Sequence, residues 1–95
     1  MGGECEAEGG LTLYSKTYHR GDKLELTDSQ PDLTQHQFAV AAVSALVTGQ
    51  CCWQVFSQTN YAGSVTTLQP GSDYTSVTSL GELFRNVRAV RKVAC

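Results

Sequence analysis

The sequence has few of the features that would point directly to a partner. Only 17% of the 95 residues are charged and the formal net charge is -2, so no general attraction to nucleic acid or anionic lipid is expected. The longest apolar stretch, residues 38–47, is too short and too interrupted to span a membrane. No apolar signal segment follows Met1, so we expect either an intracellular protein or a mature chain with an added start.

Signatures of catalysis are also lacking. The chain contains no G-x-S-x-G elbow, no phosphate-binding P-loop and no H-E-x-x-H pair. His19 and His36 lie in expected loops, where a surface histidine is the default interpretation. The carboxylates that a reaction would need are scattered and fit a solvated face, at Asp22, Asp28 and Asp32. A cysteine nucleophile would require a free thiol. We therefore predict no enzyme activity and no cofactor.

Four cysteines are the most informative residues that are present. One lies near each end of the chain and two are adjacent in the middle, at Cys5, Cys51, Cys52 and Cys95. They form no C-x-x-C pair and neither histidine is near them in sequence, so a zinc site has little support. Their placement suits two disulfides, and disulfides in a short chain indicate an oxidising, extracellular compartment.

A second informative feature is a pattern that recurs after about 42 residues. It consists of a ring side chain, another ring five positions later and a glycine two positions after that: Phe56, Tyr61 and Gly63, and upstream Tyr14, His19 and Gly21. Each pattern lies between two extended apolar stretches, which predicts a β-hairpin. The glycine is expected to adopt a positive φ or to allow a close backbone approach. The repeat predicts an internal duplication.

The rest of the chain favours strands. Alternating and β-branched residues predict strands at residues 11–15, 22–28, 43–48, 53–56, 65–68 and 87–93. Residues 38–45 are ambiguous between a helical turn and a strand, residues 74–81 are expected to hold a brief strand and a loop, and residues 82–86 one helical turn. Four short strands in each half suggest two Greek keys packed as a β-sandwich.

In these motifs the chain resembles the βγ-crystallin domain family. The residues that carry the resemblance are Cys52-Trp53, Phe56, Asn60-Tyr61, Gly63, Leu68, Gly71 and Tyr74, with the upstream copy departing at His19, where an aromatic is expected. The resemblance implies an all-β fold, a β-sandwich of two Greek-key motifs, at residues 11–95. Motif 1 would occupy about residues 11–49 and motif 2 about residues 52–93. Residues 1–10 are expected to be a flexible acidic lead-in, held at Cys5.

The duplicated motif also bears on the cysteines. It places both termini and the central linker at one pole of the sandwich. Adjacent side chains on an extended backbone point to opposite sides, so one of Cys51 and Cys52 reaches Cys5 and the other reaches Cys95. We favour the pairs Cys5–Cys52 and Cys51–Cys95, and the swapped pairing stays open.

Many members of the family bind calcium, and the resemblance indicates where the ligands would lie. The two ligand stretches correspond to residues 40–45 and 84–89, and the acidic positions that complete the sites correspond to Ser15 and Ser57. Calcium requires several oxygens, usually with carboxylate charge, and the arginines of the second stretch would repel it. We predict that no metal binds and that the calcium positions are degenerate; these are Ser15, Ser44, Ser57 and Asn86.

One basic cluster, Arg85, Arg88, Arg91 and Lys92, is present. On a strand Arg88 and Lys92 share a face and Arg91 points the other way, so the cluster is expected to split. Solvation or pairing with the acidic lead-in is the default role, and an anionic partner such as a polysaccharide is the alternative. Trp53 opens a strand and is expected in the core rather than on a ligand platform.

These observations predict a non-enzymatic, secreted, disulfide-stabilised protein with a structural or stress-protective role. Small disulfide-bonded relatives of this fold include microbial killer toxins and a metalloproteinase inhibitor. The first alternative is therefore a defence protein, either antimicrobial toxin or protease inhibitor, acting through an exposed loop at residues 29–35 or 70–78. The second is a calcium-binding module. The physiological partner is unknown, with a protein or polysaccharide as candidates; no nucleic acid and no membrane span are expected.

Overall fold

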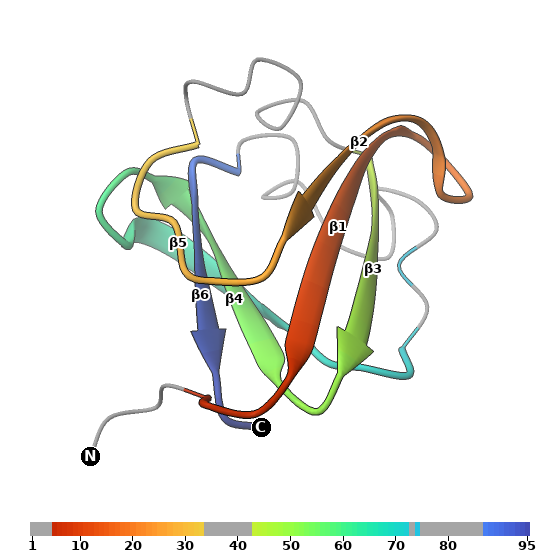
Figure 1. Ribbon diagram of the computed structural model, residues 1–95. Coiled ribbons are helices and arrows are strands. Elements are labelled where there is room, and N and C mark those ends of the chain that lie inside the picture. The colour runs from red at the N-terminus through yellow and green to blue at the C-terminus, as the bar shows by residue number, and fades with distance from the viewer. Residues whose placement is uncertain (1–4, 34–42, 73, 75–86) are drawn as a thin grey trace.

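Six β-strands make up the regular structure of the computed structural model, which describes residues 5–33, 43–72, 74 and 87–95 (Figure 1). The strands are β1 (Gly9–Lys16), β2 (Arg20–Leu26), β3 (Ser44–Gly49), β4 (Cys52–Gln58), β5 (Ala62–Leu68) and β6 (Ala89–Val93). Each overlaps a predicted strand, and the predicted all-β class is confirmed.

Several sequence predictions fall outside these residues. The helical turn expected at residues 82–86 is one of them, and so are most of the ambiguous segment at 38–45 and of the segment at 74–81. Within the described ranges no helix is long and apolar enough to cross a membrane.

The strands form two antiparallel sheets, in the orders β2-β1-β3 and β5-β4-β6, so β1 and β4 are the central strands. Side chains alternate along each of them. In β1, Leu11 and Leu13 are fully buried, whereas Thr12 and Tyr14 are partly exposed on the outer face. The alternation predicted for residues 11–15 therefore gives the side chains that face the opposite sheet.

The predicted duplication is visible in the strand boundaries. β2 and β5 have the same length and begin at corresponding positions of the repeat, at Arg20 and Ala62. The two hairpins also carry a register shift at corresponding positions, between Tyr14 and Lys16 and between Phe56 and Gln58. The two halves therefore build their hairpins in the same way.

The two motifs exchange segments across the sandwich. Gln30 and Val90 exchange backbone hydrogen bonds, and the Leu33 N–H donates to the Arg88 carbonyl, so residues 30–33 extend the sheet of the second motif beyond β6. The second motif in turn contributes Tyr74 to the first sheet, where the Tyr74 carbonyl accepts the Ala45 N–H at the β3 edge. These crossings match the predicted Greek-key arrangement.

The exposed loop expected at residues 29–35 is found in part over the residues that are described. Gln30, Pro31 and Asp32 are exposed, whereas Leu33 is fully buried. The backbone of Gln30 and Leu33 is hydrogen-bonded to Val90 and Arg88, so the loop is fixed to the second sheet at these two residues.

The core lies between the sheets and receives side chains from both. It consists of Leu11, Leu13, Leu26, Leu33, Ala45, Val47, Trp53, Val55, Leu68, Val87 and Val90. Trp53 has no exposed surface, which confirms that it belongs to the core. Each large side chain buried in this way stabilises the fold by roughly 1.5–3 kcal/mol relative to an exposed one.

Candidate functional site

The two hairpins are the regions that hold most of the candidate residues, and both use the same backbone devices. Two consecutive residues at each tip have positive φ: Tyr18 and His19 at 57° and 56°, Asn60 and Tyr61 at 59° and 59°. Gly21 and Gly63 follow with φ of 80° and 77°. A Cβ at either glycine would collide with the hydroxyl of the serine opposite, Ser15 or Ser57. Both the conformation and the space therefore require glycine.

The serine hydroxyls hold these turns closed. The Asp22 N–H donates to Ser15 Oγ at 2.8 Å, and the Ser64 N–H donates to Ser57 Oγ at 2.9 Å. Both serines were expected only as lost calcium ligands, so their role as acceptors in the turns was not predicted. A signal was present, since serine occurs at the corresponding position of both repeats.

The ring side chains cover the hairpins as the spacing predicts. Phe56 and Tyr61 contact each other edge to face, with centroids 5.5 Å apart, and Tyr14 and His19 lie 5.2 Å apart. His19 is not the surface histidine expected from the sequence. Its ring Nε2–H donates to the Ala45 carbonyl at 2.8 Å, so a half-buried imidazole replaces the aromatic ring and also bonds β3. The other histidine, His36, lies outside the described residues.

At three of the four degenerate calcium positions, Ser15, Ser44 and Ser57, the serine hydroxyl is hydrogen-bonded to backbone groups of the fold. Besides Ser15 and Ser57, the fully buried Ser44 donates its hydroxyl to the Lys16 carbonyl and accepts the His19 N–H at 3.2 Å. Asn86 lies outside the described residues. In the described ranges no group of three or more His, Cys, Asp or Glu side chains is placed to hold a metal. Calcium would have to displace backbone partners from these oxygens; that it does not bind stays a prediction.

All four cysteines form disulfides, as Cys5–Cys51 and Cys52–Cys95, so the thiol nucleophile considered above is not available. Two disulfides were predicted, but the favoured pairing was wrong and the swapped one occurs. The N-terminal segment, at residues 8–9, lies against Cys51: the Gln50 N–H donates to the Glu8 carbonyl, and the Cys51 side chain packs on Gly9.

Strand register determines the second bridge. Cys52 lies opposite Val93 in the β4–β6 ladder, two residues before Cys95. Each disulfide therefore closes one motif on itself. Figure 1 shows the C-terminus beside the start of the described N-terminal segment, which agrees with the predicted common pole.

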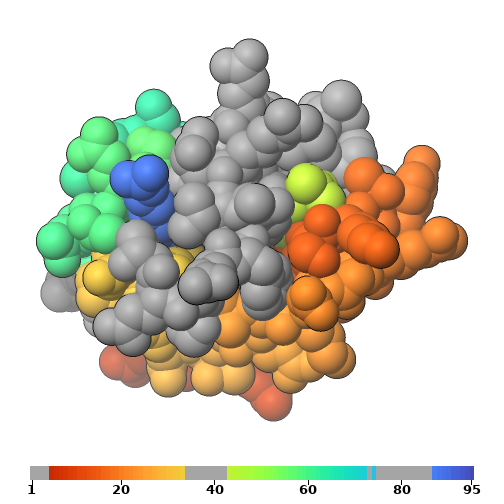
Figure 2. All heavy atoms as spheres, turned by 90° about the horizontal axis from the view of Figure 1, so that it is seen from above, coloured from red at the N-terminus to blue at the C-terminus, as the bar shows by residue number. Residues whose placement is uncertain are grey.

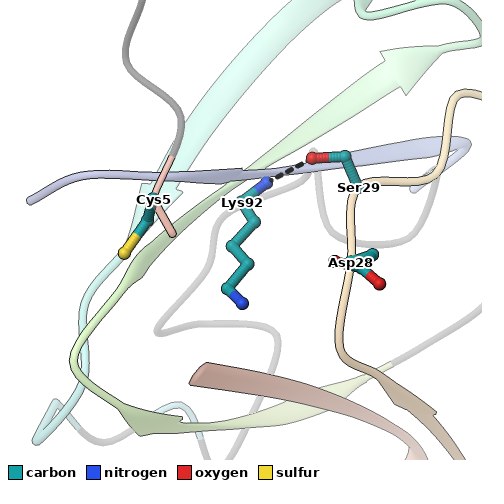
Figure 3. A pocket seen from close by; sticks show the side chains of 4 residues that line it. All are labelled: Cys5, Asp28, Ser29 and Lys92. Carbon is teal, nitrogen blue, oxygen red and sulfur yellow. Dashed lines mark hydrogen bonds between the residues drawn. The ribbon is translucent and has the colours of Figure 1, made fainter. Parts of the chain in front are cut away.

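The described part of the basic cluster splits as expected. Arg91 lies over the Tyr61 ring, 5.6 Å from its centroid. Lys92 instead lines a hollow of about 250 Å³ with Cys5, Asp28 and Ser29. Figure 3 shows that the Lys92 amine points away from Ser29, whose hydroxyl accepts the Lys92 backbone N–H at 2.9 Å. With Cys5 oxidised, this hollow offers one ammonium, one carboxylate and no nucleophilic thiol.

The outer edges of the sheets differ in charge. On β2, Lys23 Nζ lies 2.9 Å from Glu25 Oε1, and the hydrogen bond and charge of Glu25 raise the pKa of Lys23. The corresponding positions of β5 are Val65, which is 49% exposed, and Thr67. Charges on an edge strand discourage pairing with another chain, and β5 does not have this protection.

Comparison with known proteins gives consistent matches. The family model described as Beta/Gamma crystallin matches residues 10–93. Gamma-crystallin D of Mus musculus is 30% identical over 83 residues, which cover 87% of this chain and 47% of that protein. The chain thus spans about half the length of the curated relatives that it matches.

Two solved structures illustrate the likeness of fold. A beta gamma crystallin from Ciona intestinalis is 28% identical with a TM-score of 0.76, over 87% of this chain and 98% of that one. IPSE/alpha-1 from Schistosoma mansoni eggs is 27% identical with a TM-score of 0.71, over 93% of this chain and 86% of that one.

Proposed function

Because the chain belongs to the beta/gamma-crystallin family, we propose that it is a secreted, non-enzymatic domain with a structural or stress-protective role. The observation that carries the proposal is the closure of each motif by its own disulfide. A protein whose task is to persist outside the cell needs a fold that remains closed, and these bridges are placed to supply it.

The two disulfides contribute a large share of the stability of the fold. The bridges span 46 and 43 positions, and the chain-entropy model assigns each about 4 kcal/mol. A domain of this size has a total stability of roughly 5–15 kcal/mol, so the bridges are a large part of it. Disulfides persist in oxidising compartments, which supports an extracellular location.

The absence of catalysis is supported by what the candidate groups do instead. The cysteines are oxidised, three serine hydroxyls bond backbone groups of the hairpins, and the His19 imidazole bonds the Ala45 carbonyl of β3. Groups held in this way are poorly placed to attack a substrate or to transfer its proton.

The test determines both where the native protein is found and whether its cysteines are oxidised. Extracellular and intracellular fractions of the source are probed with an antibody to find the protein. The same fractions are alkylated without reductant, and the mass of the protein is measured to count free thiols. We expect the protein in the extracellular fraction with no alkyl group added, and protease resistance that is lost after reduction. Intracellular protein with four alkylated thiols would overturn the proposal. Adding calcium is expected to leave the thermal midpoint unchanged; a clear rise would favour the calcium-binding module.

A second candidate is a secreted protein that binds another protein. It is favoured by the likeness to IPSE alpha-1, which is described as an IgE-binding crystallin. The corresponding experiment measures binding of the purified, oxidised chain to immunoglobulin E, with immunoglobulin G as the control. If the chain binds immunoglobulin E no better than immunoglobulin G, or binds neither, an immunoglobulin E-binding function is rejected. Growth-inhibition and protease-inhibition assays test the defence role in parallel, and we expect both to be negative.

A further inference from the structure

The start of β2 carries the tripeptide Arg20-Gly21-Asp22 at the end of the β1–β2 hairpin. We propose that this segment binds a cell-surface adhesion receptor, which holds the Asp22 carboxylate on a divalent cation and the Arg20 guanidinium in an acidic pocket. The inference goes beyond the proposed structural role and shares with it only the extracellular location.

The position of the tripeptide makes it accessible. All three residues are exposed, and the neighbouring Tyr18 at the tip is 66% exposed. Figure 1 shows the hairpin extending past the ends of the sheets, and Figure 2 shows its atoms, in orange, projecting from one side of the molecule. Within the described residues neither Arg20 nor Asp22 makes an ion pair, so both charges are available to a partner.

The hairpin holds the tripeptide in one backbone conformation. The Asp22 N–H is bonded to Ser15 Oγ, and His19 is tied to the next strand by its own N–H, on Ser44, and by its ring, on Ala45. Gly21 has the positive φ that this turn requires. A ligand that is ordered before binding loses less conformational entropy on association, so this presentation favours affinity.

The two charged side chains suit one receptor site. Arg20 and Asp22 are two positions apart, so their Cα atoms are separated by at most about 7 Å. A carboxylate is a ligand of choice for magnesium or manganese, and a guanidinium forms paired hydrogen bonds with receptor carboxylates. A site that reads both ends of the tripeptide therefore needs only a cation and an acidic group a short distance apart.

The second repeat shows that the fold does not require these charges. The corresponding residues of the β4–β5 hairpin are Ala62, Gly63 and Ser64, with the same glycine conformation and the same hydrogen bond to a serine hydroxyl. The glycine is structural in both copies, whereas the flanking arginine and aspartate occur in one. The Lys23–Glu25 pair already places charge on the β2 edge, so edge protection does not account for them.

The experiment measures binding of the oxidised chain to the purified ectodomain of an integrin that recognises Arg-Gly-Asp peptides, in the presence of Mn²⁺. We expect saturable binding that a chelator abolishes and that a soluble Arg-Gly-Asp peptide displaces. Asp22→Glu keeps the charge but moves the carboxylate by one methylene. It is expected to weaken binding by about tenfold or more, the loss associated with one charged contact.

The matched control is Arg20→Ala with Asp22→Ser, which reproduces residues 62–64 and therefore suits the hairpin. It should keep the thermal midpoint of the wild type and lose binding. The converse change, Ala62→Arg with Ser64→Asp in that background, should restore part of it. No binding by the wild type, or binding that survives the first pair of substitutions, would overturn the inference. Either result leaves the secretion and disulfide tests of the proposed function unaffected.

Discussion

The β1–β2 and β4–β5 hairpins have the same turn, the same glycine and the same serine acceptor, yet their exposed side chains differ. The first begins its second strand with Arg20, Gly21 and Asp22 and continues with an ion pair; the second has uncharged residues throughout β5. The shared glycine and serine therefore hold the same turn in both copies. Of the residues that differ, Arg20 and Asp22 are exposed and available for a partner, whereas His19 is half-buried and bonded to Ala45.

The largest expected effect concerns the two disulfides, one in each motif. Replacing Cys5 and Cys51 together by alanine, or Cys52 and Cys95 together, is expected to cost about 4 kcal/mol in either case, because the loops are nearly equal in length. Urea unfolding of the two variants and the oxidised wild type measures this. A pair whose removal costs nothing would show that its motif is held closed by packing alone.

The next effect concerns the hairpin glycines. Gly21→Ala and Gly63→Ala are each expected to destabilise the fold by about 1–3 kcal/mol, because alanine is strained at positive φ and its Cβ meets a serine hydroxyl. Gly71→Ala is the matched control, since its φ is 83° but nothing lies within 4 Å of the added Cβ. If all three cost the same, the collision with serine contributes nothing.

A smaller effect on stability distinguishes the two pairs of ring side chains that cover the hairpins, Tyr14–His19 and Phe56–Tyr61. His19→Phe keeps a ring but removes the donor to the Ala45 carbonyl, so we expect a loss of about 1 kcal/mol. Tyr61→Phe keeps the edge-to-face contact with Phe56 and should cost less. Tyr61 itself has a φ of 59°, so an aromatic residue is compatible with this conformation. Equal losses measured by thermal unfolding would mean that the imidazole bond has no special role.

The smallest effect concerns the edge ion pair. Glu25 raises the pKa of Lys23, so the pair stabilises the fold below the ordinary lysine value of 10.5 and ceases to do so as the pH rises through the folded-state pKa. Because the Lys23 side chain is exposed, Lys23→Val should barely change the thermal midpoint at neutral pH, and high salt should remove what difference remains. A large destabilisation at high salt would point to packing instead. Light scattering of the same variant reports whether the loss of charge promotes association through β2.

The sequence allowed the fold to be predicted where local rules were sufficient. Alternating and β-branched residues located all six described strands, and the repeated ring and glycine spacing identified both hairpins. Prediction failed where a residue acts through a distant partner. His19 was expected in a surface loop because nothing near it in sequence shows the Ala45 carbonyl that it bonds. The serines were likewise considered as ligands, although their acceptor role depends on the folded turn.

By itself, the sequence determined the strands, the duplication, the buried tryptophan and the presence of two disulfides, because each follows from periodicity, spacing or count. The tertiary structure decided which cysteines pair. Cys51 and Cys52 are adjacent in sequence, and their partners differ because the segment before β1 lies against Cys51 and the end of β6 lies beside Cys52. It also decided which charges stay free: Arg91 lies over Tyr61, whereas Arg20 and Asp22 project from the hairpin. Pairing and exposure depend on contacts between distant segments, and these exist only once both sheets have formed.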